Sequence, residues 1–350
     1  MIIKINCQSG LDKQEIYKLR MKQMRQIKST SIDDNLNSLL LLGIANELLD
    51  STLFNEQDFA RLYQRLKLPM SKFKPALKIT LLSQLQMLTG RLALSNQTAA
   101  VSILSFIDNW GAKASHYAAW SGNKEMLAWI KDHAPHLLKA LNNTGKTIAH
   151  YAAWSEDKEA LEWIKNNLPD LLQISDSDGR TIAHAAAQSG NQEVLEWIKD
   201  NTSGLLEVKN NLGLTIAHDA AWFGNKEALE WIKNYDSNLL EMKDNEERTI
   251  AHEASFMGNK DVLEWIRIYV PHLLKMQNNW GRTIAHSAAW SGKREVLEWI
   301  KSQVPYLLKI KDSQGRTIAH SAAQSGYQDM LEWIKNNASE LLEIKSNFGQ

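Results

Sequence analysis

The sequence of 350 residues contains one cysteine and has no excess of charge of either sign. The single cysteine, Cys7, excludes an intramolecular disulfide framework and is typical of a reducing compartment. Lysine plus arginine and aspartate plus glutamate number 40 each, so the formal net charge is zero. Because a nucleic-acid-binding protein usually carries a basic excess, we expect no nucleic-acid partner.

Long hydrophobic runs are also missing. The opening residues, MIIKINCQSG, lack the apolar core of a signal peptide, since their apolar run is short and ends in polar residues. The most apolar later stretch, residues 36–49, is too short to span a bilayer and contains Glu47. We therefore expect a soluble, cytoplasmic-type protein that does not bind a membrane.

Residue patterns typical of catalysis are absent as well. No histidine precedes His116, so residues 1–107 cannot hold a Cys–His pair around Cys7 or a Ser–His–Asp triad. The sequence has no glycine-rich phosphate loop and no metal-ligand spacing. It therefore predicts a protein that is not an enzyme and that needs no cofactor and no metal ion.

The chain instead contains a repeat with a period of 34 residues. A histidine in the pattern ASH or IAH and a tryptophan in the pattern WI recur at that step, which defines seven repeats over residues 108–345, numbered 1 to 7 in chain order. The histidines are His116, His150, His184, His218, His252, His286 and His320.

Each repeat has the pattern of two short helices joined by turns. Thr147 can cap a first helix whose apolar face begins at Ile148 and continues in alanines, which allow close approach of a neighbour. Gly190 is typical of the end of such a helix. Residues 191–200 form an amphipathic second helix, and NNLG at 210–213 has the composition of a tight turn.

This pattern resembles the ankyrin repeat. The family signature T-P-L-H-x-A reads T-I-A-H-x-A at residues 181–186, and each repeat has one residue more than the usual period. The resemblance covers about two thirds of the chain and implies an all-α ankyrin-repeat solenoid that binds protein partners. The residue pattern of the repeats also resembles that of ankyrin-repeat effectors of intracellular bacteria. That similarity implies a virulence protein secreted into host cytosol for host–pathogen interaction.

Residues 1–107 do not show the repeat and are predicted to form a small helical domain that also caps repeat 1. Two alternatives to a plain binding scaffold remain open. The repeats are the substrate receptor of an enzyme whose active part is this domain or lies beyond residue 350, or the basic segment 13–28 attaches the protein to a membrane surface. We expect residues 346–350 to begin an eighth hairpin that is cut short.

The repeated histidines are predicted to be structural. Packed helices lie roughly 8–10 Å apart, whereas Zn–N bonds measure about 2.0–2.1 Å, so histidines one repeat apart cannot share a metal ion. We expect each histidine to contact the preceding threonine hydroxyl and the neighbouring turn. The glutamate and lysine of the second helix, such as Glu196 and Lys199, are predicted to form solvated pairs.

The positions that vary between repeats are the candidates for binding. The resemblance implies that partners contact the hairpin tips and the outward side of the first helix. We use the name aromatic column for the position four residues after each histidine, which is Trp, Phe or Gln. Packing of these rings on one another as a ladder is the alternative to exposure for binding. The candidate partner-binding residues, chosen as aromatic or atypical at outward positions, are Trp110, Tyr117, Trp120, Tyr151, Trp154, Leu212, Leu214, Asp219, Trp222, Phe223, Glu246, Glu253, Phe256, Met257, Trp280 and Trp290.

Repeats 4 and 5 depart furthest from the common pattern. Leucines replace polar or basic hairpin residues, Phe223 and Met257 replace serine, and DNEE at 244–247 lacks the turn glycine. These changes predict an apolar patch with an acidic border, suited to a partner segment with apolar anchors and a lysine or arginine. Drift without a binding role is the alternative. The opposing basic row, interrupted by Leu214, comprises Lys146, Arg180, Arg248, Arg282 and Arg316.

Overall fold

The computed structural model describes residues 110–155 and 157–349. The domain predicted for residues 1–107, including segment 13–28 and Cys7, lies outside the described residues. Within the described part, the regular elements are α-helices and short 3-10 helices, and no strand occurs there. The prediction of an all-α fold is confirmed for these residues. They belong to two compact units, the first formed by 110–152 with 159–167 and the second by the remaining described residues.

The first compact unit holds repeat 1 and most of repeat 2. Its helix α6 packs against α7 and α9. The elements in this part of the chain are α6 (Ala114–Trp120), α7 (Lys124–His133), η2 (Pro135–Leu137), α8 (Ile148–Ala153) and α9 (Glu159–Asn167).

The second compact unit holds repeats 3 to 7, each with a first helix, a second helix and a short helical turn. The elements are η3 (Pro169–Gln173), α10 (Ile182–Ser189), α11 (Gln192–Thr202), η4 (Ser203–Leu206), α12 (Ile216–Phe223), α13 (Lys226–Tyr235), α14 (Asn238–Glu241), α15 (Ile250–Met257), α16 (Lys260–Tyr269), η5 (Pro271–Lys275), α17 (Ile284–Trp290), α18 (Arg294–Gln303), η6 (Pro305–Lys309), α19 (Ile318–Ser325), α20 (Gln328–Asn337) and η7 (Ser339–Leu342).

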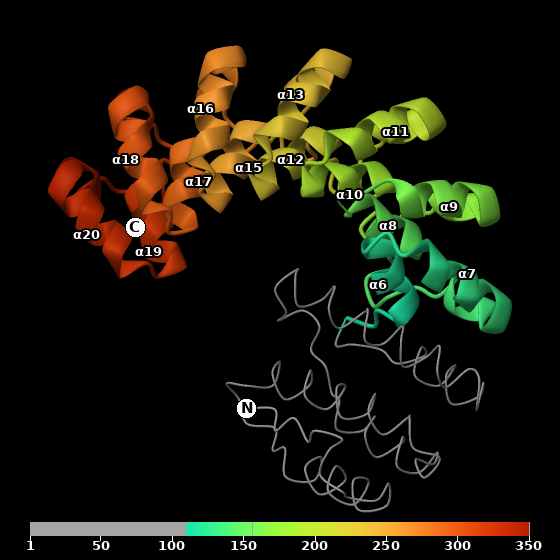
Figure 1. The fold of residues 1–350 in the computed structure, drawn as a ribbon. Coiled ribbons are helices and arrows are strands. Elements are labelled where there is room, and N and C mark those ends of the chain that lie inside the picture. Colours follow the sequence, from blue (N-terminus) through green and yellow to red (C-terminus); the bar gives the residue numbers. More distant parts are fainter. Residues whose placement is uncertain (1–109, 156, 350) are drawn as a thin grey trace, which may run out of the picture. The chain divides into compact units, whose positions relative to one another are not determined.

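The first helices of this unit lie side by side in chain order. Helix α12 packs between α10 and α15, and α17 packs between α15 and α19 (Figure 1). Ala220, Ala221 and Ala254 at these contacts are fully buried. Because their side chains are single methyl groups, neighbouring helices can approach closely, and a larger side chain would push them apart.

The histidines join each first helix to the following hairpin. His252 Nδ1 accepts from the Thr249 N–H at 3.2 Å, and its Nε2 lies 3.1 Å from the Arg282 carbonyl in the next repeat. His218 makes the same pair of contacts with Thr215 and the Arg248 carbonyl, both at 3.2 Å. An acceptor at Nδ1 requires the proton on Nε2, so these rings are neutral donors to the next repeat.

The second helices are joined by a contact between tryptophan and glutamate. The indole N–H of Trp265 donates to Glu230 Oε2 of the preceding repeat at 3.0 Å, and that of Trp299 donates to Glu264 Oε2 at 3.2 Å. The same glutamates pair with the basic residue three positions on, as in Glu230 with Lys233 at 2.5 Å. The glutamates predicted to be solvated partners of lysine therefore also hold successive repeats together.

Hydrogen bonds also align the hairpins. The Asn245 N–H donates to the Leu212 carbonyl at 3.0 Å, and the Asn279 N–H donates to the Glu246 carbonyl at 3.1 Å. Within one hairpin, Asp244 Oδ1 accepts from the N–H groups of Glu246 and Arg248 at 2.9 and 2.8 Å. Consecutive hairpin tips therefore form a row in which each side chain has a defined neighbour one repeat away.

Candidate partner-binding surface

Hairpins 4 and 5, together with the outward side of their first helices, hold most of the atypical residues. We use the name repeat 4–5 surface for hairpins 209–214 and 243–248 and the outward residues of α12 and α15. All of these elements lie in the second compact unit, and the tips of the two hairpins are adjacent. The atypical residues of the two repeats are therefore neighbours in space.

The candidate residues differ widely in exposure. Four are exposed, namely Trp110 (53%), Leu212 (55%), Phe223 (52%) and Trp280 (41%). The half-buried ones are Trp120, Trp154, Trp222, Glu246, Phe256, Met257 and Trp290. Five are buried, namely Tyr117, Tyr151, Leu214, Asp219 and Glu253.

The aromatic column is in part a ladder. Trp222 and Phe256 stack with ring centroids 5.5 Å apart and an angle of 21° between their planes. The Trp154 indole N–H donates to Gln188 Oε1 at 3.0 Å, so the glutamine takes part in the same row. Since these rings are half-buried, each both packs on its neighbour and keeps an exposed edge.

The two tyrosines of the first compact unit fill its interior. Tyr117 and Tyr151 meet edge to face with centroids 5.9 Å apart, and the Tyr151 hydroxyl accepts from Asn142 Nδ2 at 3.2 Å. Their rings are at most 8% exposed. The prediction that they lie outward, where a partner could contact them, does not match this placement.

Asp219 and Glu253 are also buried, whereas the sequence indicates an exposed acidic border. Asp219 Oδ2 lies 3.3 Å from Arg180 Nε, and Glu253 Oε1 lies 3.4 Å from Arg248 Nη1. The arginines come from hairpin positions that lie over the first helices and cover the carboxylates. Burial raises the pKa of Asp219, and it raises the pKa of Glu253 to about 7 despite the nearby Arg248.

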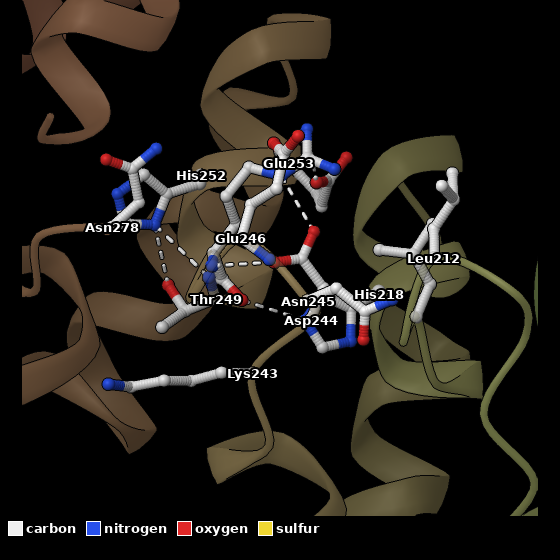
Figure 2. Close-up of polar contacts among 12 residues, drawn as sticks. Leu212, His218, Lys243, Asp244, Asn245, Glu246, Thr249, His252, Glu253 and Asn278 are labelled. Carbon is white, nitrogen blue, oxygen red and sulfur yellow. Dashed lines mark hydrogen bonds and ion pairs between the residues drawn. The ribbon is translucent and has the colours of Figure 1, made fainter. Parts of the chain in front are cut away.

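Arg248 is the cation of a cluster that contains three carboxylates. Its Nε lies 2.7 Å from Asp244 Oδ2 and 3.2 Å from Glu246 Oε2, and its Nη1 faces Glu253. Figure 2 shows Asp244, Glu246 and Glu253 gathered beside hairpin 5, with Leu212 on the neighbouring hairpin. One guanidinium cannot neutralise three ionised acids, so the cluster favours a further cation or a proton.

The tip of hairpin 5 is strained. Glu247 has a φ of 60°, the one positive φ among non-glycine residues in the described part of the chain. The other hairpins carry glycine here, for example Gly213 with a φ of 79°. A side chain with a Cβ atom is disfavoured in this left-handed conformation, and such strain often accompanies functional sites. The missing glycine is visible in the sequence, but the conformation that the glutamate adopts is not.

Residues 110–155 and 157–349 contain neither a candidate metal site nor a candidate membrane-spanning helix. No group of three histidine, cysteine, aspartate or glutamate side chains there is placed to hold a metal ion. None of the helices in those ranges is both long enough and apolar enough to cross a bilayer.

Comparison with known proteins agrees with this geometry. A family model described as "Ankyrin repeats (many copies)" matches residues 115–164, and one described as "Ankyrin repeats (3 copies)" matches residues 150–241. No curated protein matches the chain. The matched segments show that residues 115–241 carry ankyrin repeats, and the described part of the chain folds as an all-helical ankyrin-repeat solenoid.

Proposed function

We propose that this protein is a non-enzymatic scaffold that binds a protein partner through the repeat 4–5 surface. Ankyrin repeats are generally protein–protein interaction modules, and the choice of surface rests on one observation. Leu212 and Phe223 are more than half exposed at positions where repeat 3 carries Asp178 and Ser189. Exposed apolar side chains that the repeat pattern does not need are typical of a binding site.

The partner that fits this surface has apolar anchors and at least one basic side chain. Phe223 and the edges of Trp222 and Phe256 offer apolar contact, and the acidic cluster around Arg248 lies on the adjoining hairpin. Aromatic residues of this kind supply most of the free energy in many protein interfaces. The rest of the surface would set specificity through charge.

The first test replaces the two exposed residues by those of repeat 3, in the variant Leu212→Asp/Phe223→Ser. Because both side chains are exposed, the change leaves the core intact and the circular dichroism spectrum unaltered. Affinity capture with the full chain should lose the proteins that wild type retains. The control Ile268→Ala/Tyr306→Ala alters two other exposed apolar residues, in α16 and η6, and should retain them.

The stronger variant Trp222→Ala/Phe223→Ser/Phe256→Ala removes the stacked pair as well. If it still captures the same proteins as wild type, the repeat 4–5 surface is not the binding site. A role as a bacterial effector that engages a host protein is part of the proposal. Its one support is the resemblance of the repeat sequences to those of ankyrin-repeat effectors. Partners captured from eukaryotic lysate but not from bacterial lysate would favour that role, and the reverse result would contradict it.

A further inference from the structure

Arg180 and Asp219 form an ion pair between successive repeats that loses its cation one repeat later. Arg180 of hairpin 3 reaches Asp219 of the next first helix, with Nε 3.3 Å from Oδ2, and its Nη1 lies 2.7 Å from Asp178 Oδ2 at the tip of the same hairpin. One repeat later, the equivalents of Arg180 and Asp219 are Leu214 and Glu253. The acid is present in this second pair and the cation is missing.

The carboxylate of Glu253 is only partly compensated by other cations. Its Oε1 is buried and makes no hydrogen bond. Arg248 Nη1 lies 3.4 Å away, but the same guanidinium also faces Asp244 and Glu246. A buried carboxylate oxygen without a hydrogen bond is costly, and it favours any ligand that supplies a charged donor.

The residues around Glu253 also carry a net negative charge. Residues 209–223 and 243–257 contain five carboxylates and three lysines or arginines. The equivalent stretches of repeats 6 and 7, residues 277–291 and 311–325, each carry one more cation than carboxylate. The equivalent stretch of repeat 3, residues 175–189, carries one more carboxylate than cation, and residues 243–257 of repeat 5 carry two more. The acidic excess is therefore largest at hairpin 5 and α15, where it complements a basic ligand.

An exposed apolar side chain, Leu212, lies at the tip of hairpin 4. Leu212 occupies the place of Asp178, so the tip residue that holds Arg180 in repeat 3 is replaced by an exposed leucine. The aliphatic part of a long basic side chain packs well on such a surface. The missing cation and the changed tip residue are thus two substitutions on one hairpin.

We propose that the partner segment inserts an arginine side chain between hairpins 4 and 5, where its guanidinium pairs with Glu253 and Glu246 and its stem lies on Leu212. This inference rests on the proposed function. The guanidinium has five donors in a planar fork, so one arginine can serve both carboxylates. Glu246 and Arg248, whose side chains are 44% and 27% exposed, are the two that rotate to open the approach to Glu253.

The test uses peptides, because the partner is unidentified. A random 12-residue peptide library displayed on phage is panned against the full chain, and the selected peptides are synthesised and titrated. We expect arginine beside leucine, phenylalanine or methionine to be enriched. Replacing that arginine by glutamine should weaken binding at least tenfold. Replacement by lysine should weaken it less than glutamine does but measurably, since lysine keeps the charge without the fork.

Two variants of the protein address the site directly. Leu214→Arg supplies the missing cation from within the chain, and Glu253→Gln removes the acid. Both variants should bind the arginine-containing peptides at least tenfold more weakly than wild type. The control Glu207→Gln changes an exposed acid outside this surface and should leave peptide binding unchanged. Because Leu214→Arg restores the residue type of repeat 3, thermal unfolding should show a stability equal to or above that of wild type, which separates lost binding from lost folding.

A pH series adds an independent readout. The charged groups that face Glu253 are Arg248, Asp244, Asp219 and Glu246. With its pKa near 7, Glu253 must lose a proton to pair with the guanidinium, so peptides without histidine should bind about tenfold more tightly at pH 8 than at pH 6. Glu253→Gln should remove this difference.

The inference is wrong if the selected peptides lack arginine enrichment, if lysine replaces arginine without loss, or if both protein variants bind like wild type. Peptides that lose binding with Leu212→Asp/Phe223→Ser but carry no basic residue would overturn this inference and leave the proposed function standing. Peptides that bind that variant as well as wild type would overturn both.

Discussion

Glu253 is a carboxylate that the fold keeps out of water at a measurable cost. Burial raises its pKa from 4.5 to about 7, so the folded state holds its proton more tightly than the unfolded chain does. Stability contributed by this group is therefore complete below about pH 4.5 and is lost as the pH rises to about 7. The neutral acid is tolerated, whereas the ionised acid shares Arg248 with two other carboxylates.

The variant Glu253→Gln should raise the free energy of unfolding by about 2–3 kcal/mol at pH 8, because glutamine never carries the buried charge. At pH 5 the acid is already neutral in the folded state, so the gain should fall to about 1 kcal/mol or less. Urea titrations at the two pH values measure both numbers. Equal effects at pH 5 and pH 8 would contradict the assignment of the raised pKa to Glu253.

Glu247 tests the strain at the tip of hairpin 5. Its φ of 60° lies in the left-handed region, which costs a residue with a Cβ atom about 1–2 kcal/mol. We expect Glu247→Gly to raise the free energy of unfolding by about 1 kcal/mol, since glycine adopts this conformation readily. The neighbouring change Glu246→Gly is the control and should not stabilise the protein, because Glu246 has no positive φ.

The first helices depend on neutral histidines. Burial lowers the pKa of His218, His252 and His286 to about 4, although backbone carbonyls of the next repeat accept their protons. A folded pKa below the unfolded value of 6.5 means that stability is complete above pH 6.5 and is lost as the pH falls toward 4. The geometry at Nδ1 agrees with this direction, because a second proton on the ring would face the threonine N–H that Nδ1 accepts.

We expect each of these three histidines to remove about 2 kcal/mol of stability between pH 7 and pH 5. Glu253 acts in the opposite direction over the same range, so the measurement belongs in the Glu253→Gln background. Urea unfolding at pH 7, 6 and 5 should then show a steady decline. Unchanged stability over this range would mean that the histidines are protonated in the folded state.

The second helices depend on tryptophan side chains as donors as well as on their bulk. Trp299 is 8% exposed, and its indole N–H is bound to Glu264 of the preceding repeat. Trp299→Phe should lower the free energy of unfolding by about 1–2 kcal/mol, since it removes a hydrogen bond to a charged acceptor and some buried area. Trp280→Phe at an exposed tip is the matched control, and equal losses in the two variants would argue against a role for the Glu264 contact.

At the scale of the second compact unit, stability is expected to be a sum over repeats and the contacts between neighbours. Ala221 is fully buried between first helices, whereas the equivalent alanine of repeat 7, Ala323, is exposed. Ala221→Leu should force α12 away from its neighbours and cost about 1–3 kcal/mol. Ala323→Leu should change stability by less than about 0.5 kcal/mol.

Hydrogen exchange would show where the cost of Ala221→Leu falls. Amide protection should drop in repeats 3 to 5, which include α12 and its neighbours α10 and α15, and remain in α19 and α20. A uniform loss of protection through α20 would instead indicate that the unit unfolds in a single cooperative step.

Formal neutrality of the whole chain conceals an uneven distribution of charge. The 40 basic and 40 acidic residues balance, yet repeats 4 and 5 hold a local acidic excess beside exposed leucine and phenylalanine. Total composition excludes a strongly basic protein, but a partner responds to the field of the residues that it meets. A basic partner would respond to this local pattern of charge, which the total charge of the chain does not show.

Several features of the fold follow from the printed sequence. The hydroxyl of Thr147, predicted to cap a first helix, accepts from the Ala149 N–H at 3.1 Å at the start of α8, and Gly190 follows the last residue of α10. The second helix predicted for residues 191–200 is α11, Gln192–Thr202. These predictions are correct because capping, turn conformation and helical periodicity are local properties of the chain.

The structure alone decided which variable residues are exposed and which are buried. Tyr151 and Glu253 occupy the same position of the repeat and both are buried, whereas Leu212 at a hairpin tip is exposed. Sequence spacing places Tyr151 and Glu253 at one position of the first helix, but it does not show that Tyr117 packs on Tyr151 or that Arg248 faces Glu253. Contacts between residues 34 or more positions apart, such as Arg180 with Asp219 and Trp299 with Glu264, arise only when repeats stack. The sequence by itself therefore determined the repeated frame, because each repeat is specified by local chemistry. The tertiary structure decided the burial, pairing and protonation of the changeable residues, because those depend on the neighbouring repeat.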